Sequence, residues 1–277
     1  MHWMKQLVNL CLVGTITVLA GCATKRCPDN EAPLYKYHAT IGSAWVGGGL
    51  TGIRYQSLRE AALSTGARAG LAWRAAEINR LIECHARELD LIFNFTAMLL
   101  DNNVLPPVLI EGRQNLEQTS DDIIRVFDRA YSIQSNARFV TMAPTWREYL
   151  RMEYEDPGMP DSSLLPRSST ERSVWDRYVD EGWQAGITQA DVIYEENLGR
   201  LKRDYQGMVI YRTLLAQNMV SLPYVAQVNF GITGGDGQMA INDRMLRITA
   251  KPEFITASNE WKTQITPLNK QPAPDDR

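Results

Sequence analysis

The sequence has no excess of positive charge. Its 277 residues contain 29 lysines and arginines against 32 aspartates and glutamates, a formal net charge of −3 at pH 7. Proteins that bind nucleic acid normally carry a basic excess or a basic stripe, whereas basic residues here alternate with acidic ones along most of the chain. We therefore expect no direct contact with nucleic acid.

Histidine is also scarce, with three residues in the whole chain. His38 lies in a segment without periodicity. His85 directly follows Cys84 in a segment of helical pattern, where adjacent residues point away from each other. Neither histidine is placed to activate a cysteine or serine nucleophile, and the spacing matches no metal-ligand motif. We expect no catalytic, cofactor-binding or metal site, although a cell-envelope hydrolase that uses only carboxylates stays an alternative.

Long hydrophobic runs are absent apart from one N-terminal segment. There, Lys5 precedes an apolar run over residues 7–19 that polar residues and a glycine interrupt, whereas a transmembrane helix needs about 20 apolar residues. The run closes in Leu19-Ala20-Gly21-Cys22. A positive start, a short apolar run and small residues before a cut are typical of a signal peptide. We predict a lipoprotein signal over residues 1–21, with acylated Cys22 as the mature N-terminus.

The acylated cysteine predicts where the protein resides. Burying acyl methylenes contributes about 0.8 kcal/mol each, so several acyl chains hold a protein on a membrane permanently. Ala23 follows the cysteine in place of aspartate, which in bacterial sorting favours the outer membrane, facing the periplasm. Residues 22–52 contain prolines and a glycine cluster without periodicity, which predicts a flexible tether. The cluster matches the G-x-G-x-x-G pattern of dinucleotide sites, but no strand precedes it, so we favour a hinge.

Cysteine chemistry is left partly open by the sequence. Cys11 leaves with the predicted signal and Cys22 is predicted to be acylated. Cys27 in the tether and Cys84 on a helix then remain in an oxidising compartment. They form either a disulfide or two separate thiols, and the sequence does not decide between the two.

The first half of the predicted domain begins with helices and continues with extended segments. Residues 53–90 lack proline and repeat small and apolar residues at helical spacing, which predicts one helix or two in series. The small residues would let another element approach closely, and we expect Gly66 and Gly70 to bend the helix. The tandem prolines within residues 104–110 predict an extended, buried connection.

Weaker patterns follow that connection. Residues 123–127 and 137–141, together with Tyr131 and Ile133 between them, predict two or three strands. Residues 153–158 have the composition of an acidic, solvated turn.

The second half of the predicted domain consists of a long helix and a hairpin. Ser168-Ser169-Thr170-Glu171 is a capping-box pattern, and we expect the helix that it opens to end at Pro223. Residues 224–233 and 239–249 flank Gly234-Gly235-Asp236-Gly237, which predicts a β-hairpin. The helix carries one apolar stripe, expected to belong to the core: Ile187, Ala190, Tyr194, Leu198, Leu201, Tyr205, Met208, Tyr211 and Leu215.

These patterns predict an α+β fold. We expect long helices packed with a small antiparallel sheet and a C-terminal β-hairpin. They form a single domain over residues 53–250, and a polar, proline-containing tail covers residues 251–277.

Several strings of residues carry a resemblance to a known family. The sequence resembles the DotC family, lipoproteins of the Dot/Icm type IVB secretion system, together with the TraI lipoproteins of related conjugative plasmids. The likeness extends from about Ile53 to Ala250. Its strings are Ala69–Arg74, Asn103–Arg113, Pro144–Arg147, Arg203–Met208, Leu214–Ser221 and Asn242–Ala250.

The resemblance implies a structural and assembly role without enzyme activity. It implies a place in the outer-membrane core of a type IVB apparatus, beside a DotD-like lipoprotein and a ring-forming DotH-like protein. Several copies of the chain would be present in one ring. No catalytic residues or cofactors come with it. The short C-terminal tail favours a conjugative system, while the cargo, DNA or effector proteins, is not decided by the sequence.

A third class of function, a ligand-binding or lipid-binding lipoprotein, depends only on the aromatic content. Its candidates are Trp73, Trp146, Trp175 and Trp183. Tryptophans of a hydrophobic core explain the same composition.

Overall fold

The computed structural model describes residues 32–38 and 52–262. The predicted signal peptide, Cys22 and most of the predicted tether lie outside these residues. The fold is α+β, as the sequence predicted. Its helices are α1 (Gly52–Cys84), α2 (Ala86–Ile92), α3 (Trp146–Leu150) and α4 (Ser169–Ala216), and its strands are β1 (Val104–Leu105), β2 (Val108–Ser120), β3 (Ile123–Ser135), β4 (Arg138–Phe139), β5 (Tyr224–Gly235) and β6 (Gln238–Ala250). Within the described residues, no helix is both long and apolar enough to cross a membrane.

Helix α4 begins where the sequence placed its start. The Ser168 side chain accepts a hydrogen bond from the Glu171 backbone N–H at 3.2 Å, which satisfies one of the unpaired donors of the first turn. The Glu171 carboxylate does not close the predicted capping box, because it accepts from the Arg167 N–H instead. A complete capping box occurs at the start of α3, between Thr145 and Glu148.

The prediction that Pro223 ends this helix was wrong, because α4 stops at Ala216. Asn218 adopts a left-handed backbone conformation with φ +56°. Its N–H donates to the Leu215 carbonyl at 3.0 Å, and the Met219 N–H donates to the Leu214 carbonyl at 2.9 Å. This pair of bonds is a Schellman motif, which closes a helix without proline.

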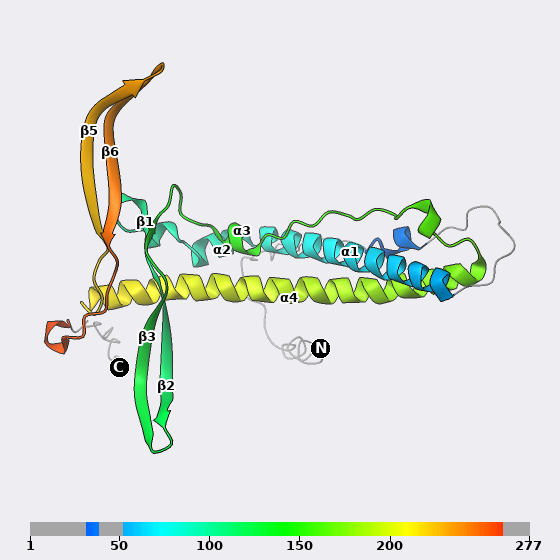
Figure 1. Ribbon diagram of the computed structural model, residues 1–277, viewed down its shortest axis with the longest axis horizontal. Helices are drawn as coiled ribbons and strands as arrows, with labels where there is room; N and C mark the ends of the chain where they lie inside the picture. Colours follow the sequence, from blue (N-terminus) through cyan, green and yellow to red (C-terminus); the bar gives the residue numbers. More distant parts are fainter. Residues whose placement is uncertain (1–31, 39–51, 263–277) are drawn as a thin grey trace, which may run out of the picture. The chain divides into compact units, whose positions relative to one another are not determined.

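Helices α1 and α4 pack side by side along much of their length (Figure 1). Arg54 pairs with Glu171 and Arg74 with Asp191, and Gly66 lies against Val179. In each of these pairs, the residue number on α4 exceeds the residue number on α1 by a nearly constant amount, so the two helices run parallel.

Four glycines form the contact between these helices. Gly66 and Gly70 on α1 face Gly182 and Gly186 on α4, and a Cβ on any of the four would overlap a carbonyl oxygen of the opposite backbone. Small residues four apart let helix backbones approach closely. The close approach expected for this face is therefore confirmed. Helix α1 continues through Gly66 and Gly70, and both glycines have a packing role that the sequence did not assign to them.

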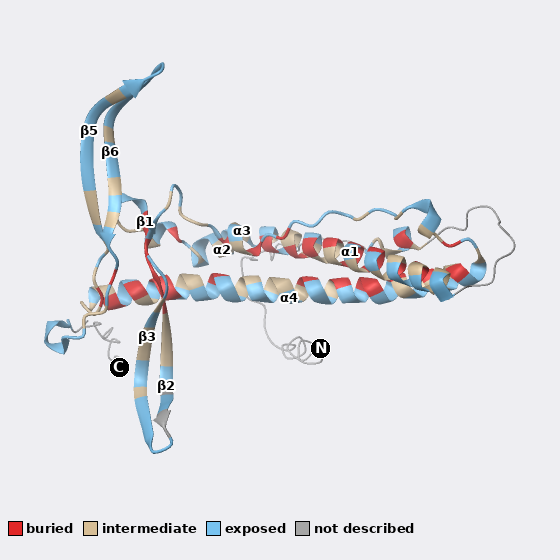
Figure 2. Ribbon diagram, in the orientation of Figure 1, coloured by how far each residue is buried: buried red, intermediate tan, exposed pale blue. Residues whose placement is uncertain are grey.

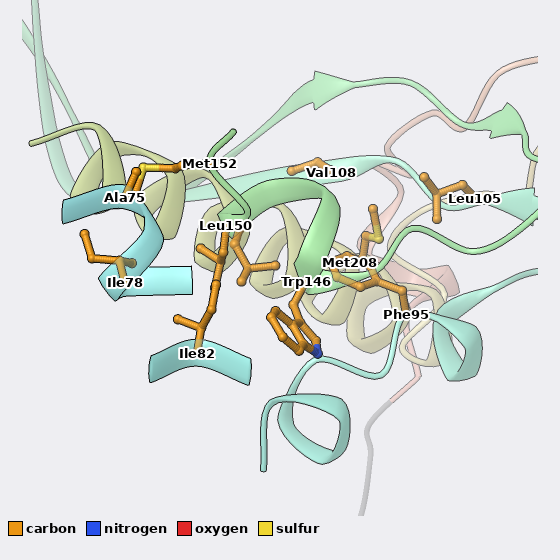
Figure 3. Close-up of a cluster of buried hydrophobic side chains, with 11 residues drawn as sticks. Ala75, Ile78, Ile82, Phe95, Leu105, Val108, Trp146, Leu150, Met152 and Met208 are labelled. Atoms are coloured by element: carbon orange, nitrogen blue, oxygen red, sulfur yellow. The ribbon is translucent and has the colours of Figure 1, made fainter. Parts of the chain in front are cut away.

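The hydrophobic core consists of three clusters along α4. Trp175 and Trp183 fill the first, against Leu58 of α1. The second gathers Trp146, Phe95, Ile82 and Met208, among others (Figure 3). The third joins Leu109 of β2 to Tyr211 and Leu214 of α4. Trp146, Trp175 and Trp183 are buried in these clusters. Trp73 is partly buried against Trp183, with the two rings tilted and their centroids 5.6 Å apart, so a core role explains all four tryptophans.

In the described segments, the strands form three separate two-stranded antiparallel sheets, β1–β4, β2–β3 and β5–β6. The predicted extended connection is confirmed, since Pro106 and Pro107 are buried between β1 and β2. The predicted strand at residues 123–127 is the start of β3. The sequence did not indicate that β2 continues for 13 residues to Ser120.

The C-terminal hairpin β5–β6 is confirmed, and its turn residues Asp236 and Gly237 both have positive φ. Residues after β6 return to the end of α4. The Ile255 N–H donates to the Met219 carbonyl at 2.9 Å, and the Lys262 N–H donates to the Gln217 carbonyl at 2.8 Å.

Candidate assembly surfaces

Of the four cysteines in the sequence, only Cys84 lies within the described residues, and it is disulfide-bonded. The other three cysteines all precede residue 32, so the partner lies outside the described part of the chain. Cys22 and Cys27 lie there too. The question that the sequence left open is thus answered for Cys84, which is not a free thiol.

Both histidines in the described segments contact carboxylates. His38, which the sequence assigned to the tether, lies against α4 with its Nε2 atom 2.8 Å from an Asp180 oxygen. His85 is exposed, 3.7 Å from Glu88. Over residues 32–38 and 52–262, no group of three or more histidine, cysteine or acidic side chains is arranged to hold a metal ion.

The C-terminal hairpin exposes apolar side chains toward its turn. Ile232 and Ile241 are directly paired across the strands and are 71% and 65% exposed, and Met239 is 70% exposed. Figure 2 shows this part of the hairpin mostly in the colour of exposed residues. Strand β5 contains no charged residue over its 12 positions, although charges and proline are the usual protection of a free strand edge.

The β2–β3 hairpin repeats the same feature. Leu116 and Val126 are paired across the strands and are 65% and 69% exposed, and Ile123 and Ile124 are each 55% exposed. Its connecting residues, Asp121 and Asp122, are acidic and also exposed.

Exposed apolar hairpins of this length favour contact with another molecule. A two-stranded hairpin is at best marginally stable in water by itself, and each one presents open strand edges to which a further strand can add. Clusters of exposed apolar side chains typically mark interaction sites. The exposed surfaces of both hairpins are therefore suited to docking another molecule.

The base of the β2–β3 hairpin packs on α4, and the segment before β5 is hydrogen-bonded to the same helix. A Cβ at Gly207 would overlap Leu109 of β2, so glycine lets this strand cross the helix closely. Before β5, the Tyr211 hydroxyl donates to the Ser221 carbonyl at 3.1 Å, and burial raises the pKa of Tyr211 to about 12. The β2–β3 hairpin therefore extends from a packed base and the β5–β6 hairpin from a segment bonded to α4, while apolar side chains toward both turns stay exposed.

An apolar groove lies between β3, the end of α4 and the returning C-terminal segment. Its volume is about 780 Å³. Aromatic and apolar side chains dominate the lining, among them Phe127, Tyr131, Met219, Phe254 and Trp261. The sequence did not predict this groove, since residues 251–262 had the composition of a tail.

Comparison with known proteins assigns the chain to a family. No curated protein matches the sequence. A family model described as "Type IV secretory system, conjugal DNA-protein transfer" matches residues 52–263, which include every described α-helix and both long hairpins. The TraI-type resemblance noted from the sequence strings is thereby confirmed, and the chain belongs to this family of type IV secretion and conjugation components.

Proposed function

We propose that this protein is a structural and assembly component of the outer-membrane core complex of a type IVB secretion or conjugation apparatus. Acylated Cys22 anchors it to the outer membrane, facing the periplasm. It helps to position a ring-forming DotH-like partner together with a DotD-like lipoprotein. The observation that carries the proposal is the family match over residues 52–263. The exposed apolar hairpins support it, because they offer docking surfaces on a rigid base.

The proposed anchor has a physical advantage for assembly. A permanent lipid anchor confines the folded body to a plane, which raises the effective concentration of partners that are bound to the same membrane. The packed glycine contact between α1 and α4 keeps that body rigid. An anchored, rigid body with exposed hairpins can present the same surfaces to each partner at one distance from the membrane.

The first test is Cys22→Ser in the native host. We expect the chain to fold but to leave the outer-membrane fraction, because the acyl anchor is lost, and the ring-forming partner to leave with it. Membrane fractionation followed by immunoblotting measures both proteins. Cys11→Ser, in the predicted signal peptide, is the matched control and should change neither. Unchanged fractionation of the partner in Cys22→Ser would contradict the anchoring role.

The disulfide of Cys84 provides a second test of the N-terminal processing. If Cys11 is removed with the signal and Cys22 is acylated, Cys27 is the remaining partner. Cys27→Ser is then expected to release one thiol, at Cys84, that a maleimide labels in the unreduced, denatured protein. The wild type should take no label before reduction. Labelling of the unreduced wild type, or no new label in Cys27→Ser, would exclude this pairing.

A further inference from the structure

The apolar groove at the end of α4 runs along an edge of strand β3. Four residues of β3 line it, three of them consecutive: Phe127, Asp128, Arg129 and Tyr131. Successive side chains of a strand point to opposite faces, so a groove that consecutive residues line follows an edge of the strand. Strand β2 occupies one edge of β3, and in the described segments no strand pairs with the other. The groove therefore adjoins open backbone N–H and C=O groups.

The opposite side of the groove is apolar and aromatic. Phe254 and Trp261 line it from the returning C-terminal segment, and Met219 lines it from the residues that follow α4. The Trp261 indole N–H donates to the Ile255 carbonyl at 2.8 Å, while the residue stays 43% exposed. A strand edge that faces such side chains suits an extended peptide, whose backbone pairs with the edge and whose apolar side chains contact the aromatic rings.

The chain leaves the described residues at this groove. The Lys262 N–H donates to the Gln217 carbonyl at 2.8 Å, and Gln217 lines the groove together with Trp261. Residues 263–277 follow in the sequence and lie outside the described part of the chain. Thr263 is thus bonded directly to a residue that is held at the groove.

The first residues of that segment have the composition of a short strand. Thr263-Gln264-Ile265-Thr266 contains three β-branched residues, a type that favours strands. Four extended residues span about 13 Å, which matches the rise of about 13 Å from Phe127 to Tyr131 along β3. Pro267 comes next and has no N–H to donate, so strand pairing would end there.

We propose that Thr263–Thr266 add as a third strand to the open edge of β3 in the same chain and place Ile265 in the aromatic groove. The direct connection through Lys262 gives this segment a high effective concentration at the groove, which favours it over a separate peptide. Covering an open strand edge also protects it from pairing with other proteins. The C-terminal segment therefore keeps this edge closed.

A lipid surface suits the groove less well, because it offers no hydrogen-bond partners to an open strand edge. The contact of the C-terminal segment does not depend on the acylation of Cys22 or on any ring partner. Its test is therefore separate from that of the proposed function.

The direct test is photo-crosslinking in the full-length protein. Ile265 is replaced by the photoreactive residue p-benzoylphenylalanine, and mass spectrometry identifies the crosslinked peptides after irradiation. We expect crosslinks within one chain to residues 127–131 or 254–256. The same replacement at Ala273, beyond the proposed strand, is the matched control and should not give them. Crosslinks from position 265 mainly to other parts of the chain, to a second copy or to a different protein would overturn the proposal.

A competition experiment tests whether the segment closes the groove. A fluorescent peptide with the sequence of residues 262–268 is titrated with full-length protein, and anisotropy measures its binding. Ile265→Asp in the protein is expected to increase the affinity at least about tenfold, because a carboxylate is costly among apolar side chains and the tethered competitor is lost. Ala273→Asp should bind the peptide like the wild type. Equal affinity for the wild type and Ile265→Asp, or no binding to either, would exclude the contact.

Discussion

Gly186→Ala is expected to destabilise the protein by about 3 kcal/mol, the upper part of the range for overpacked interiors. The added Cβ would overlap the Ala67 carbonyl oxygen, with the Leu71 backbone nitrogen 2.7 Å away. Both atoms belong to the backbone of α1, which cannot move aside as a flexible side chain can. The two helices must separate, and the core cluster around Trp183 loses contacts with them.

Gly199→Ala on the same helix is the matched control. No atom lies within 4 Å of the Cβ that it adds, and alanine in a helix is more stable than glycine by about 0.5–1 kcal/mol. For a chain of this size, we expect a melting temperature about 6–12 °C lower for Gly186→Ala and about 1–4 °C higher for Gly199→Ala. Circular dichroism of the full chain in detergent measures both. A shift of the same sign in both variants would contradict the close glycine contact.

Local sequence signals located helix starts and the C-terminal turn correctly. Ser168 begins α4 because its hydroxyl can satisfy a backbone donor wherever the rest of the chain lies. Gly234-Gly235-Asp236-Gly237 predicted a hairpin because its central residues tolerate positive φ, and Asp236 and Gly237 adopt it. Such features depend on a few neighbouring residues, which is why a single sequence reveals them.

Features that depend on distant partners were not predictable in the same way. Gly66 and Gly70 were visible as glycines, but the glycines that they face lie more than 100 residues later in the chain. Strand β2 extends to Ser120 although it lacks the alternation of buried and exposed residues that identifies a strand. Such alternation arises when one face is buried, and the distal residues of this hairpin whose burial is described, 116–118 and 121–126, are all exposed.

The candidate surfaces show the same limit. The sequence predicted the C-terminal hairpin, but apolar residues at the positions of Ile232 and Ile241 are normally read as core, although both are exposed. The absence of charge from residues 224–235 was the one signal of a different role. The family resemblance supplied the role that composition and periodicity could not, and the anchoring residue Cys22 stays a prediction.

Glu171→Gln is expected to cost about 3 kcal/mol at neutral pH, the lower end of the range for breaking a buried charge pair. The Glu171 side chain is 9% exposed and lies 3.1 Å from the Arg54 guanidinium. Arg54 also donates to the carbonyls of Ser163 and Leu165. The Arg54–Glu171 pair therefore joins the starts of α1 and α4 to the segment that precedes α4. Neutral glutamine removes the negative charge of Glu171 from this largely buried pair.

The pH dependence of this effect has a definite sign. The Arg54 hydrogen bond holds the pKa of Glu171 below its ordinary value of 4.5, with the Arg167 N–H acting in the same direction. A carboxyl whose pKa is lower in the folded state stabilises the fold above its ordinary pKa, and that contribution is lost as the pH falls through the folded-state pKa. Urea unfolding should therefore show the full difference between wild type and Glu171→Gln at neutral pH and a smaller difference in acid. Glu196→Gln, at an exposed position on α4, should match the wild type throughout. Because α1 and α4 must stay in register for their glycines to meet, a difference that persists unchanged in acid would mean that packing, and not the Arg54–Glu171 charge pair, aligns the two helices.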